Sequence, residues 1–130
     1  MEKEQHKTEG KKILIIEDQQ VFIEMFGGKL KQDGFDVSSA NNGAWGIKEA
    51  LAKDFDLLVI DMVMPAMGGE EIVARLKAEE KTKNIPIIII SASVDEETQK
   101  RVEAMGVDAF FIKTRITPKD LSHKAQAILQ

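Results

Sequence analysis

A short apolar run that ends in a carboxylate is the feature that most constrains the fold of this chain. Residues 57–60, Leu-Leu-Val-Ile, lead directly into Asp61, and a turn containing Pro65, Gly68 and Gly69 follows. An unbroken apolar run of this length is typical of a strand buried on both faces, as in a parallel sheet. Asp61 is therefore predicted at the carboxyl end of a strand, which is where open α/β sheets place their ligand sites.

Other short apolar runs repeat this design. Strands are predicted over residues 12–16, 35–39, 56–61, 87–91 and 109–113. Apolar residues at helical spacing predict helices over about 20–32, 43–53, a segment around Ile72 that runs to about Lys81, 94–105, and a last helix from Pro118 onward. Strands that alternate with helices indicate an α/β fold, a doubly wound parallel sheet of five strands with helices on both faces.

One domain accounts for nearly the whole chain. Residues 1–10 are polar, mixed in charge and without periodicity, so we expect a flexible N-terminal tail there and a single domain over residues 11–130. Neither an internal repeat nor a linker is visible. Periodicity alone does not give the order of the strands in the sheet.

The composition excludes several classes of protein. The chain has no cysteine, so disulfides and thiolate metal sites are excluded. Its net charge of −4, without a basic stripe, argues against a direct nucleic-acid partner. No apolar run approaches the ~20 residues of a membrane span, and the start is too polar for a signal peptide, so a cytoplasmic location is the default expectation.

The polar residues that follow the apolar runs form a chemically specific set. They are Glu17 and Asp18, Asp61, Ser91, and Lys113. In a parallel sheet all these strand ends lie at one edge, so three carboxylates, a hydroxyl and an ammonium are expected to converge there. Clustered carboxylates repel one another unless a proton or a cation intervenes, and hard oxygen ligands favour Mg²⁺. Asp61 could then accept a phosphoryl group as an acyl phosphate, with Lys113 and Ser91 stabilising the transferred oxygens.

The same residues resemble a known family. The motifs are Ile15-Ile16-Glu17-Asp18, Asp61-x-x-Met64-Pro65-x-Met67-x-Gly69, Ser91-Ala92 and Phe110-x-x-Lys113. Together they look like the receiver domain of two-component response regulators, of the chemotaxis-receiver type, over roughly residues 11–130. The resemblance implies a flavodoxin-like (βα)5 fold with strand order 2-1-3-4-5.

The resemblance also implies roles for individual residues. Asp61 would be the phosphorylation site and would take its phosphoryl group from a sensor histidine kinase or a histidine phosphotransfer protein. Asp18, Asp61, Glu17 through a water molecule, and the backbone carbonyl of Val63 would bind Mg²⁺ or Mn²⁺. Ser91 and Lys113 would contact the phosphoryl group as the remaining catalytic residues.

A switch is implied as well. Ser91 would move toward the phosphoryl group, and Phe110 would change rotamer with it. This would reshape the face formed by the fourth helix, the fifth strand and the fifth helix, to which a downstream protein partner would bind. The resemblance is compatible with a monomer or with a dimer promoted by phosphorylation, and with a signalling protein that catalyses at most its own phosphorylation and dephosphorylation.

The chain departs from the family pattern in four places. Glu17 stands where many members have an aspartate, Ser91 replaces the commoner threonine, and Phe110 lacks the hydroxyl of the frequent tyrosine. The usual proline after the lysine is Thr114 here. Because a cis bond before a non-proline residue costs ~2.5–4 kcal/mol, we expect a trans peptide and an altered loop over residues 114–117.

Other functions remain as alternatives. A phosphorylation-independent interaction module on the same fold would typically have lost Asp61 or Lys113. A flavin or nucleotide binder needs a glycine-rich or hydroxyl-rich phosphate loop after the first strand, where this chain has carboxylates. A phosphatase that uses an aspartyl phosphate would need a second acid shortly after Asp61, and Met62 and Val63 are not acids. Each site residue alone also has an ordinary role, as a helix cap, a strand end or a solvated lysine.

Overall fold

Five parallel strands form the centre of the molecule. The computed structural model describes residues 7–92 and 95–130. The strands are β1 (Lys12–Ile16), β2 (Asp36–Ala40), β3 (Leu57–Asp61), β4 (Ile87–Ser91) and β5 (Ala109–Ile112). They lie in the order β2-β1-β3-β4-β5, which confirms the expected sheet, and all four neighbouring pairs are parallel.

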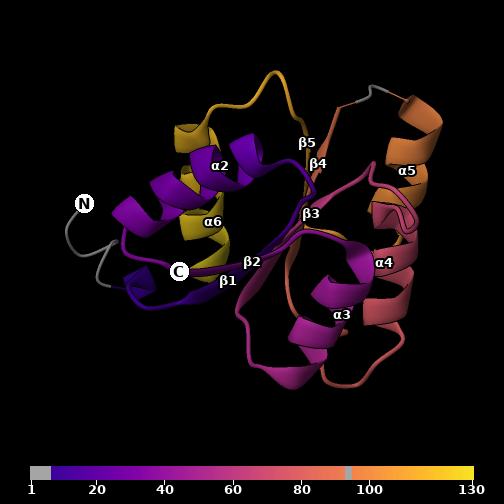
Figure 1. The fold of residues 1–130 in the computed structure, drawn as a ribbon, viewed down its shortest axis with the longest axis horizontal. Helices are drawn as coiled ribbons and strands as arrows, with labels where there is room; N and C mark the ends of the chain where they lie inside the picture. The colour runs from indigo at the N-terminus through magenta and orange to yellow at the C-terminus, as the bar shows by residue number, and fades with distance from the viewer. Residues whose placement is uncertain (1–6, 93–94) are drawn as a thin grey trace.

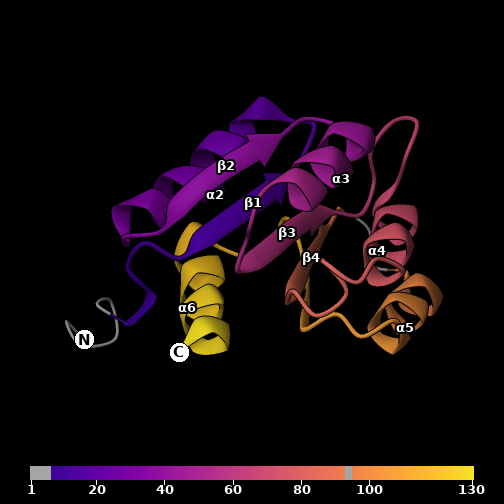
Figure 2. The ribbon, with the colours of Figure 1, turned by 90° about the horizontal axis from the view of Figure 1, so that it is seen from below.

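Helices cover both faces of this sheet. They are α2 (Gln20–Gln32), α3 (Gly43–Ala52), α4 (Gly69–Lys77), α5 (Glu96–Ala104) and α6 (Pro118–Leu129). Figures 1 and 2 show α2 and α6 on one face and α3, α4 and α5 on the other. None of the helices in the described ranges has both the length and the apolar composition that a membrane crossing requires.

The central strands supply two cores because successive side chains point to opposite faces. On β1, Ile13 and Ile15 pack with α2 and α6, whereas Leu14 and Ile16 pack toward α3 and α4. All four side chains are fully buried. The same alternation holds on β3 and β4, so an unbroken apolar run is what a strand between two helical layers requires.

Two helix boundaries differ from the sequence-based expectation. The helix around Ile72 ends at Lys77 and not at Lys81, because turns follow it. There the Thr82 hydroxyl donates to the Leu76 carbonyl at 2.6 Å, and the Glu79 amide also donates to this oxygen, at 3.4 Å. The start expected at Val94 lies outside the described residues. α5 itself begins at Glu96, with Asp95 as its N-cap.

The residues that precede β1 already contact the domain. The Gly10 amide donates to the Gly34 carbonyl at 2.8 Å, and Thr8 is fully buried. The expected flexible tail over residues 1–10 stays a prediction, and residues 1–6 of it lie outside the described ranges.

Close packing of α3 on β1 depends on a glycine. An alanine Cβ at Gly46 would lie 2.5 Å from Cδ1 and 2.8 Å from Cγ2 of the fully buried Ile16. Ile16 directly precedes Glu17, so this contact also fixes the strand end that carries the first acidic residues. Gly28 in α2 is a matched contrast, because a Cβ there would meet nothing within 4 Å.

We expect Gly46→Ala to destabilise the fold by about 1–3 kcal/mol, because the added methyl overpacks the contact between α3 and β1. Gly28→Ala should instead stabilise it by about 0.5–1 kcal/mol, the ordinary gain for alanine over glycine within a helix. Urea unfolding of both variants measures the difference. Equal stability of the two would show that α3 does not approach β1 as closely as described.

Candidate functional site

Asp61 ends the central strand of the sheet and is almost completely buried, with 1% of its surface exposed. Its Oδ1 accepts a hydrogen bond from the Val63 amide at 3.2 Å. The second carboxylate oxygen, Oδ2, lies 3.3 Å from the Lys113 ammonium. One oxygen is thus held by the backbone and the other by a cation, which fixes the orientation of the carboxylate.

The turn after Asp61 explains its glycines. The Gly69 amide donates to the Met62 carbonyl at 2.9 Å, and a Cβ at Gly69 would lie 2.8 Å from the Met62 Cα. Only glycine permits this approach of α4 to the backbone. Ala66 adopts a left-handed conformation, with φ of 67°, at the tip of the same turn. The turn therefore returns the chain tightly over the end of β3.

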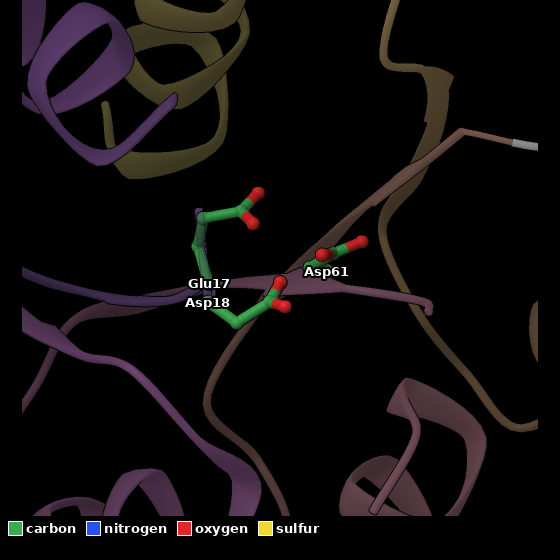
Figure 3. A group of neighbouring side chains, drawn as sticks. All are labelled: Glu17, Asp18 and Asp61. Carbon is green, nitrogen blue, oxygen red and sulfur yellow. The ribbon is translucent and has the colours of Figure 1, made fainter. Parts of the chain in front are cut away.

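Three carboxylates converge at this edge of the sheet. Each of Glu17, Asp18 and Asp61 offers one oxygen, and these oxygens all lie within 4.8 Å of one another. Figure 3 shows the side chains at the neighbouring ends of β1 and β3. Glu17 is fully buried, whereas Asp18 is exposed to solvent. The pocket is therefore open on the Asp18 side.

Lys113 reaches into the cluster from the end of β5. Its Nζ lies 2.6 Å from Glu17 Oε1 and 3.3 Å from Asp61 Oδ2, and the side chain is 4% exposed. Its Nζ also donates to Gln19 Oε1 at 3.2 Å and lies 4.1 Å from the centroid of the Phe22 ring. The lysine is thus a buried cation with two acidic neighbours.

Ser91 lies beside this lysine. Its backbone carbonyl accepts a hydrogen bond from the Lys113 amide at 2.7 Å, and 2% of the residue is exposed. A cavity of about 190 Å³ adjoins the serine; its lining residues are Met62, Val63, Ser91, Asp95, Thr98 and Phe110. Ser91 and Phe110 therefore border one space.

The electrostatics of the site favour the binding of a cation. Burial raises the pKa of Glu17 to about 7, against the opposing effect of Lys113. Burial also raises the pKa of Asp61, although the Val63 amide and Lys113 counteract it. Among the described residues, Glu17 Oε1 is a buried oxygen without a hydrogen bond of regular geometry, so only the ion pair with Lys113 offsets its burial.

This donor set fits Mg²⁺. Three carboxylates face a single ammonium, so the ionised cluster carries an excess negative charge that a divalent cation would neutralise. All the candidate ligands are hard oxygens, which Mg²⁺ prefers, and the exposed Asp18 leaves room for the waters that the ion retains. Val63 follows Asp61 by two residues, and 60% of the Val63 surface is exposed to solvent.

The loop after Lys113 follows the expectation of a trans bond. No peptide bond in the described residues is cis, and the Arg115 amide closes a turn by donating to the Ile112 carbonyl at 2.9 Å. The buried Ile116 then returns the chain to the core. Thr117 begins α6 with a capping box, in which its side chain and that of Asp120 each accept a backbone amide of the other.

Two contacts of the site were not foreseen from the sequence. Gln19 and Phe22 lie in the first turn of α2, and both contact the Lys113 side chain. Phe22 is one of the apolar residues whose spacing predicts the helix over residues 20–32, and that spacing indicates only a core position for it. Its spacing of three residues from Gln19 was the available signal, because residues at that spacing share a helix face.

Comparison with known proteins decides the family. The family model of the response regulator receiver domain matches residues 13–126. The chain belongs to this receiver family. This confirms the family that the sequence motifs indicated.

Individual relatives agree with this assignment. The phosphate regulon transcriptional regulatory protein PhoB of Pseudomonas aeruginosa is 30% identical over 93% of this chain and 52% of its own length. The alkaline phosphatase synthesis transcriptional regulatory protein PhoP of Bacillus subtilis is 29% identical over 92% of this chain and 49% of its own length. This receiver therefore spans about half the length of these curated relatives.

A solved chemotaxis receiver matches along almost its whole length. The structure of CheY4 of Vibrio cholerae superimposes with a TM-score of 0.85 and 25% identity, over 92% of this chain and 99% of that protein. Receiver domains are signalling modules rather than dedicated enzymes, and they bind Mg²⁺ at an acidic pocket. This chain has an acidic cluster of Glu17, Asp18 and Asp61. Response regulators act together with histidine kinases and downstream effectors.

The raised pKa of Glu17 predicts how this receiver responds to pH without divalent metal. The unfolded chain releases this proton near pH 4.5 and the folded chain only near pH 7, so stability from this group falls as the pH rises through that window. Glu17→Gln removes the cost of the buried charge. We expect it to stabilise the metal-free protein by about 1–3 kcal/mol at pH 8 and to have little effect below pH 4.5.

Urea unfolding in the presence of a chelator, at several pH values, measures this difference. Glu103→Gln, at an exposed glutamate of α5, is the matched control and should change stability little at any pH. A Glu17→Gln variant that is less stable than wild type at pH 8 would contradict the prediction.

Proposed function

We propose that this receiver accepts a phosphoryl group on Asp61 from a phosphohistidine of a sensor histidine kinase or a histidine phosphotransfer protein. The observation that carries the proposal is the convergence of the Asp61 carboxylate, the Lys113 ammonium and two further carboxylates at one sheet edge. In such an arrangement the buried carboxylate can react with an anionic group, because the buried ammonium beside it offsets the negative charge. The family membership supports the same reading.

Asp61 would act as the nucleophile. One carboxylate oxygen attacks phosphorus, the bond from phosphorus to the histidine nitrogen breaks, and its electron pair remains on the imidazole. The Val63 amide holds Oδ1, so Oδ2, on the side of Lys113, is the oxygen that faces the only buried ammonium of the described site. Lys113 would then pair with the oxygens of the transferred group as a point charge.

Asp18, Asp61, Glu17 through water, and the Val63 carbonyl would hold Mg²⁺ or Mn²⁺. When bound, the ion neutralises the carboxylates and the charge of the phosphoryl oxygens. The exposed Asp18 would be the direct carboxylate ligand beside Asp61. Glu17 is already engaged by Lys113 at 2.6 Å, which suits a more distant contact to the ion.

Phosphorylation would be communicated through Ser91 and Phe110. Ser91 would turn its hydroxyl toward the phosphoryl oxygens, and the half-buried Phe110 would move within the cavity that both residues line. The face formed by α5, β5 and α6 would change shape and bind a downstream protein partner. The protein would act as a monomer or as a dimer promoted by phosphorylation, and would catalyse at most its own phosphorylation and dephosphorylation.

The alternative is an interaction module of the same fold that works without phosphorylation. Buried Asp61 and Lys113 in direct contact favour the phosphoacceptor, because an interaction module does not need a buried ion pair at this edge. Uptake of a phosphoryl group separates the two functions.

Asp61→Asn should abolish phosphorylation by acetyl phosphate in the presence of Mg²⁺, because the amide cannot form an acyl phosphate. Intact-protein mass spectrometry measures the added phosphoryl group. Asp36→Asn, at an exposed aspartate on the outer strand β2, is the control and should be modified like wild type. If Asp61→Asn gains the same mass as wild type, Asp61 is not the acceptor, and if wild type gains none, the alternative function is favoured.

Asp18→Asn should weaken Mg²⁺ binding by at least about tenfold, because it removes one of the few charged ligands. Binding to the folded form raises the unfolding temperature, so the Mg²⁺ concentration that stabilises the protein measures affinity without any phosphorylation assay. Asp54→Asn is the control, since the Asp54 side chain is 96% exposed and its only described ion-pair partner is Lys81. Equal stabilisation of wild type and Asp18→Asn would exclude Asp18 as a ligand.

A further inference from the structure

The ammonium of Lys113 has contacts beyond the two carboxylates. The face of the Phe22 ring lies 4.1 Å from Nζ, and Gln19 Oε1 accepts a hydrogen bond from the same atom at 3.2 Å. Lys113 is 4% exposed and Phe22 is half-buried, so the contact with the ring is largely shielded from water, whereas Gln19 itself is exposed. An attraction between a cation and the face of an aromatic ring is strongest when the cation is desolvated in this way.

The Phe22 ring is itself fixed by the core. It stacks on the Phe26 ring with a centroid distance of 5.8 Å and an interplanar angle of 22°, and Phe26 is fully buried. Both side chains belong to the core between the sheet and the layer of α2 and α6. The ring that Lys113 contacts is therefore held in place by the core, as a flexible side chain would not be.

The first turn of α2 departs from the usual helix start. Gln19 is the N-cap residue, but its side chain makes no capping hydrogen bond and binds Lys113 instead. The Phe22 amide donates to the Gln19 carbonyl at 3.1 Å, which places both residues on one face of this turn. The Gln19 side chain is thus turned toward the lysine and not toward the free amides at the start of the helix.

We propose that Phe22 is a positioning residue for Lys113, with Gln19 as a second support. This rests on the proposed function, in which Glu17 and Asp61 gain new partners as metal and a phosphoryl group arrive. Phe22 has neither a charge to be neutralised nor a metal-binding atom, so its contact with Lys113 does not compete with those partners. The ring keeps the ammonium at the site while the carboxylates around it are engaged elsewhere.

The contact has a spectroscopic signature that a merely structural phenylalanine would lack. Protons above the face of an aromatic ring are shifted upfield, so the ε-methylene protons of Lys113 should resonate upfield of those of the exposed lysines in the unphosphorylated protein. The shift should disappear in Phe22→Leu and persist in Phe22→Tyr, which keeps the ring. Lys113→Arg assigns the signal.

The rate of phosphorylation by acetyl phosphate at saturating Mg²⁺ tests the consequence. We expect Phe22→Leu to lower the rate about three- to tenfold and Phe22→Tyr to remain within about twofold of wild type. Phe35→Leu is the matched control, because Phe35 is a buried member of the same core cluster and has no described contact with Lys113. It should lose stability but keep the wild-type rate.

Several results would overturn the proposal. They are a Lys113 signal without an upfield shift in wild type, a wild-type rate in Phe22→Leu, and an equal loss of rate in Phe35→Leu. The Lys113 signal in the wild-type spectrum tests the contact with Phe22 even if the Phe22→Leu variant does not fold. Because that spectrum needs no phosphorylation, a protein that takes up no phosphoryl group counts against the proposed function, while the Lys113 signal still tests the contact with Phe22.

Discussion

The ion pairs of Lys113 are the interaction on which the site depends. Glu17 and Asp61 come from the ends of two neighbouring strands, and both would be costly to bury as charges without a cation between them. One lysine offsets only part of that cost, as the raised pKa values of both carboxyl groups indicate. The site is therefore held together and yet left short of positive charge, which is the condition for binding a divalent cation.

Most of the fold follows from the sequence because its strongest pattern has a single physical explanation. The apolar runs of β1, β3 and β4 are long enough for strands and are buried on both faces, so a sheet between two helical layers was predictable. The residues that end these strands were predictable as a cluster for the same reason. Strand order came only from the family resemblance, because hydrophobic periodicity does not distinguish one neighbour from another.

The contacts of Gln19 and Phe22 could not be predicted in this way. The hydrogen bond from Lys113 to Gln19 joins residues that are 94 positions apart. It depends on the tertiary fold, which brings the start of α2 close to the residue that follows β5. At the early end of α4, too, contacts of the folded chain matter, since the Leu76 carbonyl accepts hydrogen bonds from the Thr82 hydroxyl and the Glu79 amide in the turns that follow the helix. In both cases the contact forms only in the folded chain, and the hydrophobic periodicity of a segment does not predict it.

The sheet also separates two parts of the site. Phe22 and Phe26 pack in the layer of α2 and α6, whereas Phe110 packs in the opposite layer with α4 and α5. The first layer is tied together by Ser122 of α6, whose hydroxyl donates to Asp33 at the end of α2 at 2.5 Å. The contact of Phe22 with Lys113 thus lies on the opposite side of the sheet from the Phe110 side chain. If Phe110 moves as proposed, the sheet lies between that movement and the contact of Phe22 with Lys113, so the ammonium could stay beside the phosphoryl group while the switch face changes shape.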